Sequence, residues 1–111
     1  MNLQIISLKT FTKQVKKLHK KYKKLPNDLK ILKKELFIDP KAGIELGKGC
    51  YKIRLANSSV PTGKSAGFRV IYYFLEEETN TIYLMSIYSK KDLENISDSQ
   101  IIEILNTIIK E

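Results

Sequence analysis

The sequence predicts an α+β domain, in which a helical hairpin packs on a mainly antiparallel β-sheet and a short helix closes the chain. Three observations predict this fold class. Apolar residues recur at helical spacing through residues 10–38, alternate with polar residues through much of 50–88, and return to helical spacing after residue 97. The chain has 111 residues, the size of one domain with a modest core. We therefore treat residues 1–111 as a single domain.

The first third of the chain predicts a strand followed by two helices. Residues 3–8 (LQIISL) are short, apolar and β-branched, as in a strand. From Phe11 to Leu25 the apolar residues are spaced by four and three, which is the stripe of an amphipathic helix. Pro26 interrupts the pattern, and a second helix begins just after it and ends before Asp39. Both stripes need an apolar surface to cover, so we expect a hairpin packed on the sheet.

The middle of the chain predicts three adjacent antiparallel strands. They cover residues 50–56 (CYKIRLA), 67–75 (GFRVIYYFL) and 81–88 (TIYLMSIY). The glycine-rich residues 43–49 before them are predicted as a loop. Residues 98–110 predict the short closing helix. If the sheet carries its helices on one face, the opposite face is open.

Charge is the first clue to function. The formal net charge is +8. Residues 1–37 carry eleven basic and two acidic side chains, whereas residues 72–111 carry three and eight. A basic surface of this kind attracts polyanions, nucleic acid above all, and also acidic proteins. For any single lysine in the first helix, a purely solubilising role is the simpler interpretation.

Composition also disfavours several classes of protein. No apolar run approaches the roughly 20 residues of a membrane-spanning helix. The first residues do not have the pattern of a secretory signal, so we expect a cytoplasmic protein with no membrane partner. Cys50 is the only cysteine and His19 the only histidine, which excludes an internal disulfide and a metal site built on several thiolates. We predict neither a metal nor a cofactor.

The segment GKS at residues 63–65 resembles the end of a nucleotide-binding phosphate loop. Such a loop needs a glycine five positions before its Gly-Lys-Ser and a helix after it. That position is Ser58, and a predicted strand follows the segment. Both requirements fail, so we do not predict a nucleotide site. The metalloprotease, nucleophile-elbow and dinucleotide motifs are absent from the sequence as well.

What remains is a group of cations on one predicted sheet face. Because side chains alternate along a strand, Lys52 and Arg54 share a face, and Arg69 leaves the next strand beside them. Loop lysines at the strand ends could rim this face, and two tyrosines lie near it: Lys64, Lys90, Lys91, Tyr73 and Tyr88. A basic face edged with tyrosines suits single-stranded RNA, with its backbone on cations and its bases on rings. The alternative is a solvated face whose arginines pair with Glu or Asp.

The motifs YKIRLA, GKSAGFRVIYYF and IYSK, taken together, are similar to those of the RelE/ParE superfamily of bacterial type II toxins, and most similar to its HigB/RelE-like branch. The resemblance covers nearly the whole chain. It implies a compact RNase that enters the ribosomal A site and cuts the mRNA codon without a metal. It also implies a cognate antitoxin, encoded beside the toxin, that keeps it neutral.

The resemblance also implies which residues form the site. Lys52 and Arg54 match the family's basic pair, and Arg69 matches its central arginine. The late basic residue is matched by Lys90 or by the lysine that follows it. Some members place a tyrosine after that residue, whereas residues 92–97 contain none. Tyr88 would then have to serve.

Cleavage of RNA by its own 2′-OH requires a base, an acid and stabilisation of charge on the phosphate. Arg69 and Arg54 can clamp the phosphate, because a guanidinium pairs bidentately with its oxygens. Crowding by arginines disfavours the charged form of a lysine, so Lys52 or Lys64 could be the base. The late lysines would then supply the acid.

Two other classes of function stay open. A ParE-like toxin would bind DNA gyrase and have no nuclease activity, but such an inhibitor does not need the cations of YKIR and GFRV. A non-catalytic module that binds RNA or a protein partner is the third class.

Overall fold

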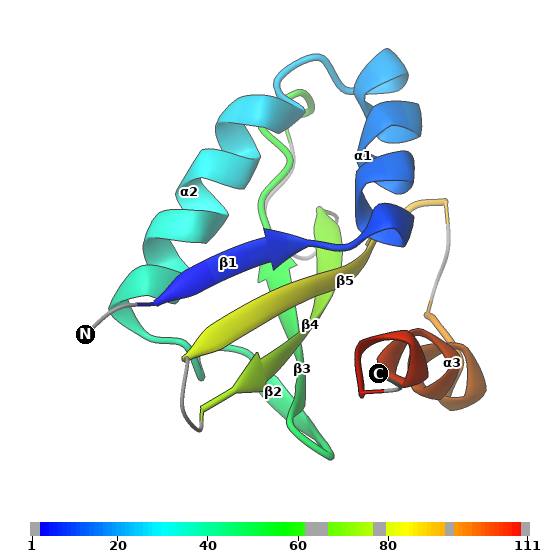
Figure 1. Cartoon of the computed structure of the whole chain (residues 1–111). Coiled ribbons are helices and arrows are strands. Elements are labelled where there is room, and N and C mark those ends of the chain that lie inside the picture. The colour runs from blue at the N-terminus through cyan, green and yellow to red at the C-terminus, as the bar shows by residue number, and fades with distance from the viewer. Residues whose placement is uncertain (1–2, 62–66, 77–79, 93–94, 110–111) are drawn as a thin grey trace.

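The computed structural model of the chain describes residues 3–61, 67–76, 80–92 and 95–109. Its elements follow in the order β1 (Gln4–Ser7), α1 (Lys9–Lys21), α2 (Leu25–Ile38), β2 (Ile44–Gly47), β3 (Cys50–Leu55), β4 (Phe68–Leu75), β5 (Thr81–Ser89) and α3 (Asp98–Ile109) (Figure 1). The predicted α+β class is confirmed, with the hairpin, the three strands and the closing helix close to their expected positions. Among the described residues, no helix combines the length and the apolar character needed to span a membrane.

Within the described residues, five strands form one sheet in the order β1-β5-β4-β3-β2. β1 pairs with β5 in parallel, and the other neighbouring strands pair antiparallel. The predicted antiparallel strands β3, β4 and β5 are consecutive in the sheet, as short connections favour. The strand nearest the start of the sequence therefore borders one from its last third (Figure 1).

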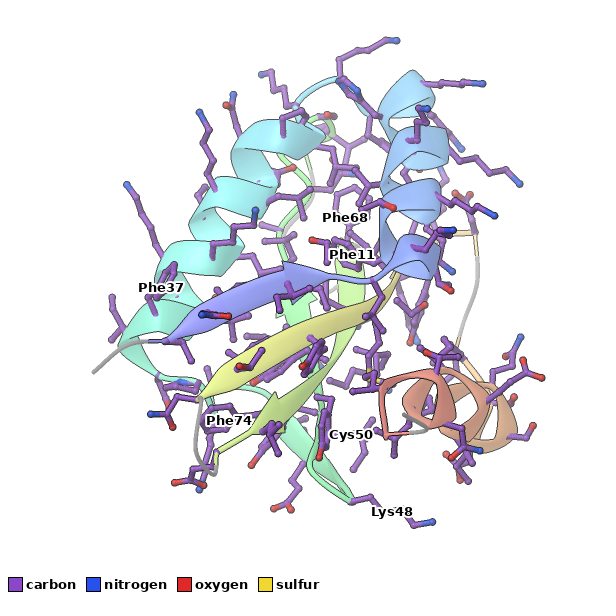
Figure 2. The ribbon with its side chains drawn as sticks, viewed as in Figure 1. Phe11, Phe37, Lys48, Cys50, Phe68 and Phe74 are labelled. Atoms are coloured by element: carbon purple, nitrogen blue, oxygen red, sulfur yellow. The ribbon has the colours of Figure 1, made fainter. Side chains whose placement is uncertain are left out.

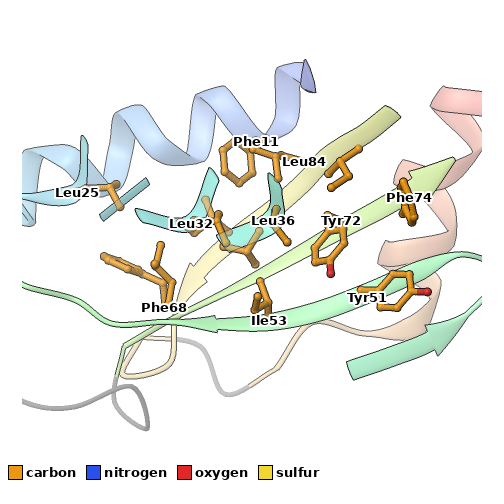
Figure 3. Close-up of a cluster of buried hydrophobic side chains, with 14 of the residues drawn as sticks. Phe11, Leu25, Leu32, Leu36, Tyr51, Ile53, Phe68, Tyr72, Phe74 and Leu84 are labelled. Atoms are coloured by element: carbon orange, nitrogen blue, oxygen red, sulfur yellow. The ribbon is translucent and has the colours of Figure 1, made fainter. Parts of the chain in front are cut away.

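The main core lies between the hairpin and one face of the sheet. Phe11 of α1 and Leu32 and Leu36 of α2 are at most 2% exposed. They pack with alternate residues of β3 and β4, among them Ile53 and Tyr72 (Figure 3). Each such leucine or phenylalanine stabilises the fold by about 1.5–3 kcal/mol through burial. Because these strand residues face the hairpin, the residues between them face the other side of the sheet.

That opposite face is not fully open, because α3 packs on part of it. Ile101 and Leu105 of α3 join Ile71 and Met85 in a second buried cluster. The condition under which the opposite face would be open, namely that all helices lie on one face of the sheet, is therefore not met. Ile71 follows Arg69 on the same face of β4, so this face has an apolar part under α3 and a cationic part beside it.

The structure adds a strand where the sequence predicted a loop. β2 pairs antiparallel with β3, and the turn between them contains Lys48 and Gly49, with φ of 55° and 81°. Two successive positive φ values are those of a type I′ hairpin turn, in which glycine is favoured at the second position. Figure 2 shows Lys48 at the tip of this hairpin. All residues of β2 are exposed, and the alternation of Ile44, Glu45 and Leu46 is too short to mark the strand in the sequence.

β5 contains a bulge that separates its two halves. A register shift between β4 and β5 leaves Met85 as an extra residue. Beyond the bulge, the Ile87 N–H donates a hydrogen bond of 2.9 Å to Oε1 of Gln14 in α1. Met85 and Tyr88 are three positions apart, so in a regular strand they would lie on opposite faces. Because of the extra residue, both lie on the α3 side of the sheet.

Candidate functional site

Three of the predicted site residues form one row across the sheet. Arg54 of β3 lies directly opposite Arg69 of β4, and Arg69 lies directly opposite Tyr88 of β5. Residues paired in this way share a face, with their Cβ atoms about 4.5–5.5 Å apart. We call Arg54, Arg69 and Tyr88 the cationic row. The sequence predicted the common face of the two arginines, and the strand register makes them immediate neighbours.

Arg69 is buried, with 6% of its surface exposed, as is Tyr88 beside it, whereas Arg54 is exposed. Nη1 of Arg69 donates a hydrogen bond of 3.3 Å to the Phe68 carbonyl oxygen. Burial, and then the charge of Arg54, lower the pKa of the Arg69 guanidinium, while Tyr88 acts in the opposite sense. An arginine still remains protonated at neutral pH. The row therefore holds a positive charge in a place where solvent screens it weakly.

The cations of this site that reach solvent are Arg54, which is exposed, and the neighbouring Lys52, which is half-buried. Within the described residues, neither Arg54 nor Lys52 takes part in an ion pair. In that part of the chain, Arg54 has no Glu or Asp partner, so the alternative of a face whose arginines pair with acidic residues does not hold for it. Arg54 and Arg69 lie directly opposite each other, and like charges at such positions are destabilising.

Asn95, which the sequence did not single out, connects two predicted site residues. Its Oδ1 accepts hydrogen bonds from the Tyr88 hydroxyl at 3.1 Å, from Lys52 Nζ at 3.3 Å and from the Ile96 N–H at 3.0 Å. Burial raises the pKa of Tyr88, against the opposing effects of Arg69 and of the Ile96 amide. The Tyr88 hydroxyl is therefore protonated at neutral pH and can donate. Asn95 is a single asparagine in a polar connection and belongs to no motif, so the sequence could not indicate these contacts.

Lys90 and Lys91 lie at the same end of the sheet as the cationic row. The Lys90 N–H donates a hydrogen bond of 2.9 Å to the Gly67 carbonyl oxygen, which joins the end of β5 to the start of β4. Lys91 is exposed in the turn that follows. Lys64 lies outside the described residues, so its place at the rim stays a prediction.

Tyr73 lies apart from the cationic row. It is four residues along β4 from Arg69, which corresponds to about 13 Å. Its ring stacks on Tyr83 of β5, with 6.2 Å between ring centroids. Ile71 lies between Tyr73 and Arg69 on this face and is buried under α3. The predicted grouping of Tyr73 with the cations is therefore not what the structure shows.

Most of the exposed lysines lie elsewhere, on the hairpin. They are Lys9, Lys13, Lys16, Lys17, Lys20 and Lys21 of α1 and Lys30, Lys33 and Lys34 of α2. His19 is exposed among them, as the sequence predicted. In the described ranges, no group of three or more His, Cys, Asp or Glu side chains is arranged to hold a metal ion. The protein thus has a broad lysine-rich surface on the hairpin and a compact arginine site on the other side of the sheet.

No family model matches the chain. Among solved structures, it is similar to two structures of the E. coli toxin RelE. One is a mutant in the free state in which two arginines are replaced by alanine, with a TM-score of 0.61 and 18% identity over 98% of this chain and 100% of that chain. The other is the isolated toxin, with a TM-score of 0.57 and 21% identity over 96% and 98% of the two chains. The hairpin, the mixed sheet and the closing helix of this protein are therefore those of a RelE-like toxin fold.

Proposed function

We propose that this protein is the toxin of a bacterial type II toxin–antitoxin system, and that it cuts mRNA on the ribosome and so stops translation. The observation that carries the proposal is the cationic row, in which two arginines and a protonated tyrosine share one position across three strands. The RelE-like fold supports it. The proposal includes a HigB/RelE-like activity, a cognate antitoxin and the mRNA-loaded ribosomal A site as partners, and the bacterial cytoplasm as the location.

The row suits the charge changes of RNA cleavage by the 2′-OH. Arg69 is held by packing, so its guanidinium can grip two phosphate oxygens without first being ordered. Arg54 beside it is exposed and can meet the phosphate from solvent. Donors fixed where charge develops stabilise the transition state more than the ground state. Tyr88 keeps its proton at neutral pH and can donate it, or a hydrogen bond, to the leaving oxygen.

Proton transfer needs a second group, and the lysines supply the candidates. Lys52 reaches the row through the Asn95 oxygen that it shares with Tyr88, so we assign it as the first candidate for the base. Lys64 is the second. Lys90 and its neighbour Lys91 are candidates for the acid beside Tyr88.

The direct test is single-turnover cleavage of ribosome-bound mRNA. Arg69→Ala should slow cleavage by about 30- to 1,000-fold, the effect of losing one preorganised donor worth roughly 2–4 kcal/mol. Arg69→Lys should recover little, because an ammonium lacks the planar two-point grip. Lys16→Ala, on the exposed side of α1, should leave the rate nearly unchanged. Circular dichroism and melting curves check folding, since Arg69 is buried. Parental cleavage by a folded Arg69→Ala protein would refute the assignment.

A second experiment separates the proposal from the other classes of toxin. On expression without a partner, amino-acid incorporation should fall before DNA synthesis does. An earlier fall in DNA synthesis would favour a gyrase inhibitor, and arrest of translation without cuts in mRNA would favour a binding module. Co-expression of the neighbouring gene should restore growth, and its product should co-purify with this protein.

A further inference from the structure

Asn95 Oδ1 is the meeting point of three hydrogen bonds that come from different parts of the chain. The Ile96 N–H is a local donor, whereas Lys52 Nζ and the Tyr88 hydroxyl come from β3 and β5. Those two strands are separated by β4, and so by about 10 Å between their backbones. The shared oxygen brings the two side-chain tips close enough for one phosphate group to contact both. No other described contact connects these two side chains.

Three donors share this oxygen, which is more than it can accept with good geometry. A carbonyl oxygen has two lone pairs, and the Ile96 amide is fixed by the backbone next to it. Tyr88 and Lys52 therefore compete for what remains, and the Lys52 bond is the longer of the two, at 3.3 Å against 3.1 Å. Lysine has three donors and a flexible stem. Lys52 is thus the member that an incoming phosphate can draw away at least cost, while Tyr88 stays in place.

We propose that Asn95 is a positioning residue, which holds the Lys52 side chain beside Tyr88 over the cationic row and releases it to the substrate. Asn95 does not react with the substrate. It acts through Lys52 and Tyr88, and because it is neutral it places the Lys52 amino group without an ion pair that would favour the protonated form. This inference rests on the proposed RNase function and deepens it. The residue also ties the site to α3, since it lies three positions before that helix begins.

The test uses Asn95→Ala with Gln100→Ala as the matched control. Gln100 belongs to the same segment, where its Oε1 accepts a hydrogen bond from the Ser97 N–H and its N–H donates to Ser97 Oγ. Removing its side chain weakens the cap of α3 but leaves the contacts of Lys52 and Tyr88 intact. Both variants should melt slightly earlier than the parent. Only Asn95→Ala should slow single-turnover cleavage, on the order of ten- to a hundredfold, as expected for a misplaced group.

Coupling and phosphate binding distinguish positioning from a structural role. If Asn95 acts through Lys52, the effects of Asn95→Ala and Lys52→Ala on the cleavage rate should combine to less than their product. Ribosome binding should change less than twofold, so the loss appears in the rate and not in affinity. Titration with inorganic phosphate, followed by the Tyr88 ¹³Cζ resonance and assigned by its absence in Tyr88→Phe, should show several-fold weaker binding for Asn95→Ala.

The outcomes separate this inference from the proposed function. If the parent does not cut mRNA, the function fails, and the phosphate titration still tests the role of Asn95. If the parent cuts mRNA and Asn95→Ala cuts equally fast, the inference is overturned and the function stands. Equal losses of rate in Asn95→Ala and Gln100→Ala, or fully multiplicative effects with Lys52→Ala, would also overturn it, because they indicate general loosening of the segment.

Discussion

Replacing Arg54 by glutamine should make the fold more stable while it weakens the proposed activity. Arg54 and Arg69 are directly opposite each other on β3 and β4, and like charges at such positions are destabilising. Cross-strand pairs contribute roughly 0.2–1 kcal/mol. Since Arg54 is exposed and therefore partly screened, we expect a gain of about 0.5 kcal/mol. For a chain of this size that corresponds to about 2 °C in melting temperature. Glutamine keeps part of the aliphatic stem, so little packing is lost.

The assay is thermal melting at low salt and again at about 1 M salt, where the Debye length is only about 3 Å. The gain from Arg54→Gln should be present at low salt and largely absent at high salt. Lys16→Gln on α1 removes one positive charge far from the row and serves as the control for net charge. A loss of 1 kcal/mol or more in Arg54→Gln would refute the reasoning, since it would mean that Arg54 makes stabilising contacts in the native protein.

Three further predictions concern the scaffold around the site. Burial raises the pKa of Tyr72 to about 12, above the unfolded value of about 10; the stability this contributes is complete below pH 10 and lost as pH rises toward 12. Urea unfolding at pH 7 and pH 11 should therefore show an alkaline loss of about 1 kcal/mol that Tyr72→Phe lacks, and equal losses in both proteins would contradict this. Gly49→Ala should cost about 1–2 kcal/mol in a melting experiment, because φ is +81° and the new Cβ would lie 2.7 Å from Cε1 of Tyr73; an unchanged melting temperature would show that the turn relaxes. Asp28→Ala should cost about 2 kcal/mol in chemical denaturation, because the buried carboxylate accepts a 3.1 Å hydrogen bond from the Ser58 N–H, whereas a change below 0.5 kcal/mol would mean that water replaces it.

The sequence predicted those parts of the fold that have a strong apolar period. The helical hairpin buries one side and exposes the other, so its spacing identifies it, whereas β4 and β5 are buried on nearly both faces and are identified by runs of apolar, β-branched and aromatic residues. β2 was missed because both of its sides are exposed and its stability comes from pairing with β3. The segment GKG between Ile44 and Tyr51 was the available signal, since a glycine at the second turn position favours a tight hairpin.

The sequence predicted several residues of the site but not how those residues are arranged. Alternation placed Arg54 and Arg69 on one face, but their direct opposition depends on the register of β3 and β4, which no local pattern encodes. The placement of α3 on that face was missed, although Ile71 beside Arg69 indicated that part of the face needed an apolar cover. Asn95 was not predictable, because its role arises from contacts with residues of two distant strands.

The order of synthesis has a consequence for when this protein can fold. The cationic row is built from β3, β4 and β5, and β1 finds its partner only in β5, where Gln4 pairs with Thr81. A growing chain that has not yet reached Tyr88 lacks the third member of the row, and without β5 the sheet has no place for its first strand. Interrupted translation of this message therefore yields chains that can neither complete the sheet nor present the row. The topology therefore delays assembly of the sheet and of the cationic row until β5 has been synthesised.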